Sequence, residues 1–545
     1  MKRRVDLGKF SVEVPHGRID ALIERFAPRW GAKRLQARIG TELAANMSAG
    51  GYHGGDSSRR SMAGWGARLL DPDAAVSPQL TTLRAHSADL IRNAPIAGGA
   101  VETAVLSVVG SGVSMKPSID WARLGMTEQQ AIVWNDDTQA EFELWCESHD
   151  CDVERATNFY GKQTQAFFSV LEVGDVLVST PSIARDTNPY RLAIQLTPGT
   201  RVCNPNGARN TDTLVDGVEK GANGEAIRYH VAARSPYTFV GKKNTWAQIS
   251  ARGRRGRRNA WLLKDHKRIG QTRGVPWLAP VIEPLKQMER YTEAELMAAV
   301  VSGMFTVFIK NEGGEPPIYN ADAPAGGSTD GAGWDGRLGN GVAVELGDGE
   351  SIETANPGRP NAQFDPFIQA IIRQIGARLQ IPFEVLLKVY QSSYSASRAA
   401  MLDAWRFFKE RRAWLVREFC QPLYEIWLDE AVSAGRVIAP GYFDDPRIRR
   451  AYQRAQWVGD GMGSIDPVKD VEAAKKRVDL EISTLESESL AYDGIPWRDK
   501  HAQRVREVSA QRKDGTALAA PSPAAPVVQS DQETGDQEVS DADAA

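Results

Sequence analysis

Two glycine-containing strings in the sequence could bind a nucleotide. Gly161–Lys162–Gln163–Thr164 matches the end of a phosphate-binding loop, but that loop needs a glycine where this chain has Ala156. Residues 331–336 satisfy GxGxxG, but a dinucleotide-binding turn must follow a buried strand and open a helix. These residues lie in a glycine-rich stretch typical of a loop. We therefore expect no bound cofactor at either string.

Cys146, His149 and Cys151 place soft metal ligands close together. A structural zinc site needs four ligands, usually in CxxC-type pairs, and Cys203 and Cys420 stand alone and far away. The chain has neither HExxH nor GxSxG, and its seven histidines are scattered. We expect no metal site and no catalytic residue.

Acid–base chemistry would need positioned carboxylates, and Glu172 with Asp175 is the strongest candidate pair for a hydrolase or nuclease. Both lie in a pattern of strands and turns, where such acids are more often surface or ion-pair residues. The sequence therefore predicts a protein that is not an enzyme. Catalytic turnover that is lost on mutation of Glu172 or Asp175 would favour the alternative, a hydrolase or nuclease.

A basic run is the best nucleic-acid signal in the chain. Residues 241–275 carry eleven Lys or Arg against the single acid Asp265. Such a run would bind a phosphate backbone by releasing counterions, without reading sequence. A solvated loop or a protein-contact patch explains it slightly better, and a non-specific DNA-binding protein using residues 252–268 is the alternative function. The patch comprises Arg252, Arg254, Arg255, Arg257 and Arg258, extended by Lys264, Lys267 and Arg268.

The apolar spacing predicts the elements that would position these residues. We expect a mixed α/β domain over residues 70–275, followed by long helices separated by loops. Ser395 is the expected N-cap of the last long helix, which should kink near Pro422. Helices are expected at 19–26, 32–39, 77–91, 97–109, 127–148, 280–310, 364–379 and 395–433, and short strands at 170–171, 176–178, 192–196, 229–231 and 342–346.

Composition indicates where in the cell the protein is expected. The chain has 545 residues, a formal net charge of -3 and four cysteines, too few for a disulfide scaffold. The longest uncharged apolar run, Leu296–Ile309, is shorter than the roughly twenty residues that a bilayer requires. The basic residues after Met1 precede no apolar signal core. We expect a soluble protein of a reducing cytoplasm, with a disordered acidic tail at 513–545.

Several local strings, in the same order along the chain, resemble the lambda family of phage portal proteins. The strongest block is residues 271–280, with Arg273, Gly274, Pro276 and Trp277. A later block holds Pro382, Tyr394, Ser395 and Arg398. The resemblance covers roughly residues 27–500. Further matches are Leu83–Arg84, Arg92–Pro95, Val108–Gly112, Trp145 with Cys151–Asp152, Glu293–Leu296, Ile381–Glu384, Trp405–Arg406, Cys420, Pro422, Trp427–Leu428 and Ile465–Pro467.

The resemblance implies an α+β portal fold and a division of the chain into regions. The α/β part would be the wing, the long helices the stem, and the loop-rich insertion between them the clip. A helical C-terminal region would form the crown. The implied regions are 1–69 (basic lead-in and flexible loop), 70–275 (wing), 276–310 (connection and first stem helix), 311–363 (clip), 364–380 (second stem helix), 381–395 (channel loop), 396–434 (long wing helix), 435–512 (crown) and 513–545 (acidic tail).

The resemblance also implies a mechanical function. Similar proteins form rings, commonly of twelve subunits, at one capsid vertex of the virion, after assembly in the host cytoplasm. Double-stranded DNA passes through the ring during packaging and ejection. The implied partners are further copies of the chain, double-stranded DNA, the terminase large subunit, the major capsid and scaffold proteins, and a head-completion or adaptor protein, with no membrane.

The candidate channel loop departs from the family pattern. The family often has an acid and then Asn before the Tyr-Ser-Ser string, whereas this chain has Lys388–Val389–Tyr390 and Ser393. We expect Lys388, Gln391 and Ser392 to lie nearest DNA. For Lys388, a solvated loop lysine is an equally good interpretation.

Overall fold

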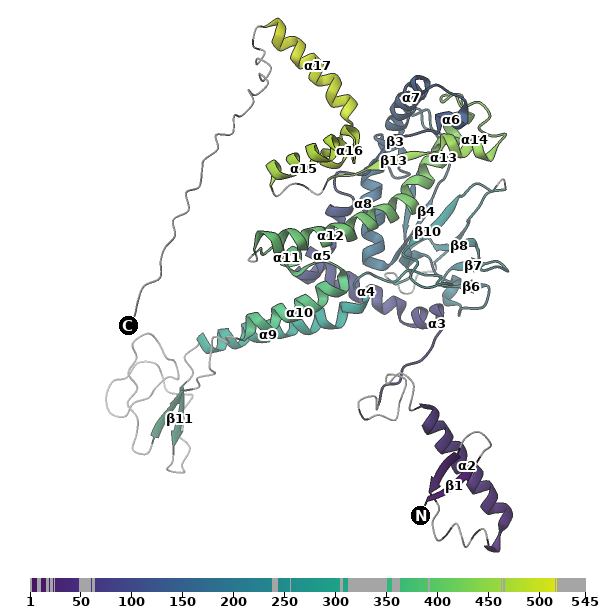
Figure 1. Ribbon diagram of the computed structural model, residues 1–545, viewed down its shortest axis with the longest axis vertical. Helices are drawn as coiled ribbons and strands as arrows, with labels where there is room; N and C mark the ends of the chain where they lie inside the picture. The colour runs from purple at the N-terminus through teal and green to yellow at the C-terminus, as the bar shows by residue number, and fades with distance from the viewer. Residues whose placement is uncertain are drawn as a thin grey trace, which may run out of the picture. The chain divides into compact units, whose positions relative to one another are not determined.

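The computed structural model divides into two compact units, Met1–Asp71 and Pro72–Ala545, which are described separately (Figure 1). In the first unit, β1 (Lys2–Asp6) and β2 (Ser11–Pro15) form an antiparallel hairpin that the sequence did not predict. Helix α2 (Pro28–Ser48) contains the helix expected at 32–39. The structure describes residues 2–6, 11–15, 19, 23, 25–48, 60, 64–237, 244–254, 256–303, 307–311, 350–354, 363–390, 393–461, 463, 466–514 and 516.

The second unit is largely helical, and local signals set several helix ends. Thr127 forms a capping box with Gln130 at the start of the helix expected at 127–148, and Pro95 opens the one expected at 97–109. The helices are α3 (Pro72–Val76), α4 (Leu80–Asn93), α5 (Pro95–Val108), α6 (Trp121–Leu124), α7 (Glu128–Cys146), α8 (Phe159–Val173), α9 (Ile282–Gly303), α10 (Phe364–Leu379), α11 (Phe383–Leu387), α12 (Tyr394–Leu415), α13 (Gln421–Ser433), α14 (Pro446–Tyr452), α15 (Pro467–Asp479), α16 (Leu485–Asp493) and α17 (Trp497–Lys513). None of these described helices is long and apolar enough to cross a membrane.

The strands of the second unit form small antiparallel sheets. The expected strands at 176–178 and 229–231 are present, but residues 170–171 belong to α8, so that prediction was wrong. A short apolar run such as Val170–Leu171 fits a buried helix as well as a strand, and α8 buries this one. The sheets are β10 (Ala260–Lys264), β4 (Asp175–Ser179) and β5 (Gln195–Pro198); β6 (Leu214–Val215), β7 (Val218–Lys220), β8 (Ala226–Ala232) and β9 (Trp246–Ser250); and β3 (Ser114–Pro117) with β13 (Ala455–Val458).

Helices α9 and α10 run side by side (Figure 1). The Tyr291 ring stacks on Phe364 at 5.7 Å and meets Phe367 edge-on at 5.2 Å. The helix expected to reach Lys310 ends at Gly303, and residues 307–311 form β11, which pairs with β12 (Glu350–Thr354). The prediction of a helix at residues 307–310 was wrong. Val307 and Ile309 are β-branched and pack well on the pleated surface of a strand. The strand expected at 342–346 lies outside the described residues.

The long helix expected at 395–433 is interrupted by a π-helical segment, Val416–Cys420, between α12 and α13. Pro422 has no N–H to donate to the Glu418 carbonyl, and the Trp261 indole N–H of β10 donates to that oxygen instead, at 3.0 Å. This hydrogen bond ties the π-helical segment to the three-stranded sheet. At the other end of α12, the N-cap whose side chain accepts from the Ala396 N–H is Ser393, two residues before the expected Ser395.

One large hydrophobic core joins the early and late parts of the second unit. Its centre is an aromatic cluster around the fully buried Phe142 of α7. The pairing of β3 with β13 brings residues 114–117 beside 455–458. The core therefore depends on segments more than three hundred residues apart. The rings nearest Phe142 are Trp145, Phe159, Tyr424, Trp427 and Trp457.

Candidate functional site

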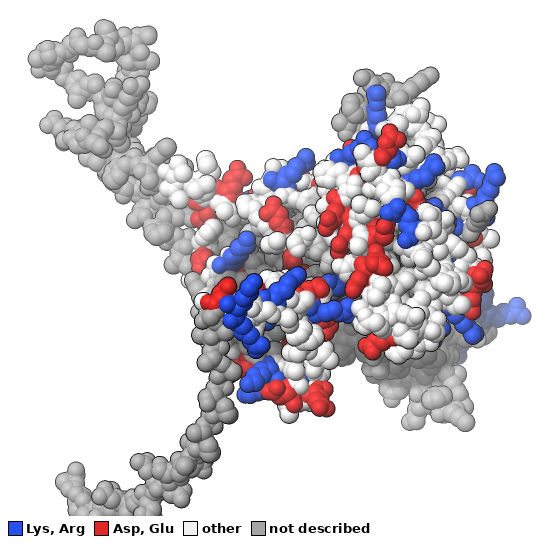
Figure 2. All heavy atoms as spheres, turned by 90° about the horizontal axis from the view of Figure 1, so that it is seen from above, with Lys and Arg blue, Asp and Glu red and all other residues white. Residues whose placement is uncertain are grey.

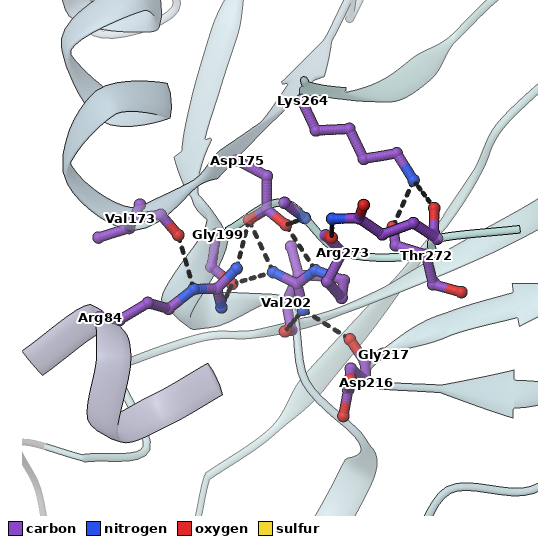
Figure 3. Close-up of polar contacts among 12 residues, drawn as sticks. Arg84, Val173, Asp175, Gly199, Val202, Asp216, Gly217, Lys264, Thr272 and Arg273 are labelled. Atoms are coloured by element: carbon purple, nitrogen blue, oxygen red, sulfur yellow. Dashed lines mark hydrogen bonds and ion pairs between the residues drawn. The ribbon is translucent and has the colours of Figure 1, made fainter. Parts of the chain in front are cut away.

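A buried charged cluster lies where β4 begins (Figure 3). The Asp175 carboxylate is fully buried and accepts from Arg84 of α4 at 2.7 Å. It also accepts from Arg273, at 2.7 Å from Nε and 2.8 Å from an Nη. Arg84 and Arg273 are only 7% and 2% exposed. A two-pronged guanidinium contact of this kind holds both partners in one geometry.

The remaining guanidinium donors of this cluster bind backbone carbonyls. Arg84 donates to Val173 at 2.7 Å and Arg273 to Val202 at 2.7 Å, and both reach the Gly199 carbonyl. The cluster thus ties α4, the end of α8 and the turns around the three-stranded sheet to one carboxylate.

The two arginines keep Asp175 ionised at neutral pH. Burial alone would raise the pKa of Asp175, but Arg273 and Arg84 outweigh it and hold the pKa at about 2. Burial lowers the pKa of Arg84 to about 10 against the attraction of Asp175. A carboxylate that stays ionised, buried and doubly paired is not poised for proton transfer. Of the two expected roles, surface residue or ion-pair residue, the structure shows the second.

The next residue of the 271–280 block is Gly274, and its surroundings require a glycine. Its N–H donates to Asp175 at 2.9 Å. A Cβ at Gly274 would overlap the carbonyl oxygen of Gly174, which itself has a φ of 92°. The two glycines therefore let two backbone segments touch where the strand begins.

The rest of the 271–280 block leads into α9. The Pro276 carbonyl accepts from the Ala279 N–H at 3.1 Å. The backbone N–H of Trp277 donates to the Leu171 carbonyl, and the Trp277 ring stacks on Phe407 of α12 with centroids 6.2 Å apart. This block thus attaches the start of α9 to both α8 and α12.

Lys264 does not belong to the exposed basic patch, contrary to expectation. It closes β10 and is 9% exposed, and its ammonium donates to the carbonyls of Gln271 and Thr272 at 2.5 and 2.6 Å. Burial lowers its pKa to about 8, against the attraction of Asp175. The sequence did not predict the burial of Lys264, because it lies in a run of basic residues and such runs are usually solvated.

The buried Lys264 predicts an alkaline gain in stability. Its pKa is about 8 when folded and near 10.5 when unfolded, so the unfolded chain binds more protons between these values. The free energy of unfolding of the wild type, minus that of Lys264→Met, should rise as pH rises from 8 to about 10.5. Urea titrations of both proteins across that range measure it. A flat difference would show that the buried ammonium keeps its ordinary pKa.

The other patch residues lie on a turn between β9 and β10. Arg252, Arg254 and Arg257 are exposed, and Arg255 lies outside the described residues. Arg258 is half-buried, with its guanidinium 5.1 Å from the centre of the Trp261 ring. Arg258 therefore supports the indole that satisfies the Glu418 carbonyl. Four exposed arginines of the patch (Arg252, Arg254, Arg257 and Arg268) and the exposed Lys267 remain for a polyanion. Basic and acidic side chains intermingle on the described surface in Figure 2.

The candidate channel loop follows α11. Pro382 precedes that helix, and its carbonyl accepts from Val385 and Leu386. Lys388 ends the helix in the left-handed conformation, with a φ of 55°, and is exposed. Gln391 and Ser392 lie outside the described residues. The structure thus presents Lys388 at a sharp, exposed turn, without bringing it together with the basic patch.

The later motif residues hold α12. Tyr394 is its first residue, and the Ser395 hydroxyl lies 3.2 Å from that of Ser393. Arg398 donates to Asp470 of α15 at 2.8 Å. This contact links α12 to the C-terminal helices.

The string Gly161–Thr164 and the cysteines Cys146 and Cys151 contribute buried side chains to the core. Lys162 is buried in α8, 2.8 Å from Asp152. Cys146 and Cys151 are buried, and burial raises the pKa of each to about 12. The described residues contain no group of three or more His, Cys, Asp or Glu able to hold a metal. Residues 331–336 are outside the described part.

The sequence pattern did not predict the ion pair between Asp175 and Arg273. One feature of the sequence could have predicted it: Asp175 begins a continuous apolar strand. An acid in that place is buried and needs a cationic partner. Arg84 was among the family matches, but nothing local identified it as a partner of Asp175, which is ninety-one residues away.

Comparison with known families decides the classification. Residues 58–412, more than half of the chain, match the family described as "Phage portal protein, lambda family". The chain belongs to this family. Portal protein B of Escherichia phage lambda is 27% identical over 496 residues, covering 85% of this chain and 90% of the relative. The portal protein of Escherichia phage N15 is 27% identical over 497 residues, covering 85% and 91%.

Solved structures also resemble this portal-family chain. One is titled "Virion of native gene transfer agent (GTA) particle", with 11% identity, a TM-score of 0.39 and coverage of 77% of this chain and 92% of that one. Another, the neck of the native GTA particle, has 10% identity, a TM-score of 0.39 and coverage of 77% and 94%.

Membership of the portal family confirms the resemblance found in the sequence. Portal proteins are structural subunits, so the chain is a structural protein and not an enzyme. The mixed α+β fold is also as expected. The motif residues Arg273, Gly274 and Trp277 make the contacts that join the elements around β4 to the start of α9.

Proposed function

We propose that this chain assembles into a ring, in our view a dodecamer, at one vertex of a viral capsid. The ring provides the channel through which double-stranded DNA is packaged and ejected. The observation that carries the proposal is the family match over residues 58–412. A closed ring requires each subunit to present two different, complementary faces.

The described elements suit this function when assigned to the regions of a portal subunit. The α/β part over 70–275 serves as the wing, and α9 with α10 as the stem. The insertion at 311–363 serves as the clip, where the terminase large subunit docks. The helices after residue 435 serve as the crown. Assembly takes place in the host cytoplasm with the major capsid and scaffold proteins, and a head-completion or adaptor protein joins later.

The turn after α11 is the proposed DNA-proximal element. DNA must slide through a channel, so contacts should be to the backbone, weak and without base readout. Lys388, exposed at the end of α11, provides one positive charge per subunit. Gln391 and Ser392 complete the proposed loop. A ring repeats this charge around the bore without creating a tight site.

Native mass measurement with negative-stain imaging tests the proposal directly. The expected result is a ring with a central hole and a mass that is a multiple of the 59.7 kDa subunit. A stable monomer or dimer under all salt conditions would overturn it. If that monomer bound DNA and lost binding on charge reversal of Arg252, Arg254 and Arg257, the chain would be a non-specific DNA-binding protein.

A further inference from the structure

The last three helices of the chain, α15–α17, contribute almost nothing to the hydrophobic core. Among residues 466–514, all of which the structure describes, Ser489 is the one buried residue. Helix α13, by contrast, buries six of its thirteen residues. Since packing against a core supplies most of the stability of a helix in a protein, α15–α17 are held far more weakly than α13. Large apolar side chains stay exposed on them, among them Val468, Val471, Leu480, Ile482, Leu485 and Tyr492.

Polar contacts join these three helices to one another. The Arg477 guanidinium of α15 donates to both oxygens of the Glu488 carboxylate of α16, at 2.8 and 2.5 Å. Glu486 of α16 accepts from the backbone N–H of Trp497, the first residue of α17, at 2.9 Å. A two-pronged contact between arginine and carboxylate fixes orientation as well as distance. We call α15–α17 the C-terminal lobe, and these contacts keep its helices together when it moves.

The contacts of the lobe with the rest of the second unit include an ion pair near the start of α12. Arg398, one turn into that helix, donates to Asp470 of α15 at 2.8 Å. The two side chains are 36% and 32% exposed, so solvent screens their attraction, and the pair shifts an equilibrium by at most about fivefold. A second ion pair, between Arg498 of α17 and Asp136 of α7, is longer, at 3.6 Å, and more exposed.

The chain that leads into the lobe is held firmly as far as Asp460. Its carboxylate accepts from the backbone N–H and the hydroxyl of Ser111, at 2.8 and 2.7 Å. Its backbone carbonyl accepts from Arg412 of α12 at 2.8 Å. Gly461 then touches the lobe, because a Cβ at this residue would lie 2.6 Å from the Ala491 carbonyl oxygen. The boundary between the fixed core and the lobe therefore falls directly after Asp460.

We propose that the C-terminal lobe undocks as one piece from the rest of the unassembled subunit, and that the ion pair between Arg398 and Asp470 is the latch that holds it. Undocking leaves the core intact, because the lobe shares almost no buried surface with it. The latch grips α12 near its start, so undocking also frees the end of the helix that follows the proposed channel loop. The latch stands without the ring, whereas its effect on the loop rests on the proposed function.

Hydrogen exchange of the full, unassembled chain, read by mass spectrometry, tests the undocking. The backbone amides of α16 in the wild type should exchange at least about tenfold faster than those of α13, after correction for intrinsic rates. Equal protection of α16 and α13 would overturn the undocking, because it would show that the lobe opens only when the core unfolds.

A charge exchange in the same measurement tests the latch. Arg398→Glu and Asp470→Arg each replace an attraction by a repulsion, so each should speed the exchange of α16 about fivefold. The double variant R398E/D470R should return it to within about twofold of the wild type. Reading α16 rather than α15 excludes the local effect of a new charge in the first turn of α15. Arg406→Glu, an exposed arginine of the same helix, is the matched control and should behave as the wild type does.

The outcomes separate the latch from the other proposals. Unchanged protection of α13 in every variant verifies that the core is folded. Fast exchange of α16 that R398E does not alter, or that the double variant does not restore, would overturn the latch. Neither result depends on assembly, so a chain that forms no ring would overturn the proposed function and leave the latch in place.

Discussion

Replacing Asp175 by Asn is expected to lower the free energy of unfolding by about 3–5 kcal/mol. Asn keeps the shape of Asp but removes the carboxylate that pairs with both Arg84 and Arg273. Two guanidiniums then remain buried against each other without a counter-charge, and removing one partner of a buried pair costs far more than the pair contributes. Urea unfolding of the unassembled chain measures the loss.

Asp212→Asn is the matched control for this prediction. Asp212 is exposed in the same part of the chain, so its loss should change stability by less than about 0.5 kcal/mol. The pKa of Asp175, about 2, lies below the usual value of 3.8, so its contribution is complete above pH 4. The advantage of the wild type over D175N should therefore shrink as pH falls from about 4 to 2. Equal stability of the two proteins at pH 7 would refute the role assigned to the cluster.

Replacing Phe142 by Ala is expected to cost about 3–5 kcal/mol, because the cavity lies where α7, α8, α13 and β13 meet. The Phe142 ring is 5.0 Å from that of Trp427 and 6.4 Å from that of Trp457. Both partners are bulky and held by their own neighbours, so the site cannot collapse onto the cavity. Chemical denaturation of F142A measures the effect.

Leu144→Ala provides the comparison within the same helix. Leu144 is 49% exposed, so the same truncation should cost much less, about 1 kcal/mol or below. Similar losses for F142A and L144A would show that the aromatic cluster does not carry the packing energy of this core.

These stability predictions bear on function through the elements that they connect. The Asp175 cluster holds the segment that leads, through Pro276 and Trp277, into α9. A weakened cluster would loosen the start of α9, the helix that we propose as part of the stem. We therefore expect a variant that weakens the Asp175 cluster without unfolding the chain to lower the yield of rings.

The family, the helical character of most of the chain and several helix ends were determined by the sequence alone. A capping box at Thr127 and a proline at Pro95 act on neighbouring residues, so their effects can be predicted locally. The ordered motif blocks identified the family, and the match over residues 58–412 confirms it.

Only the tertiary structure decided the roles of individual charges. Asp175 meets Arg84 and Arg273 across more than ninety residues, and Lys264 is buried within a run of solvated basic residues. It also decided that residues 170–171 are helical and that residues 307–311 form a strand. The reason is physical: local patterns state which side chains prefer burial, but the energy of a buried charge depends on the partners that folding brings to it.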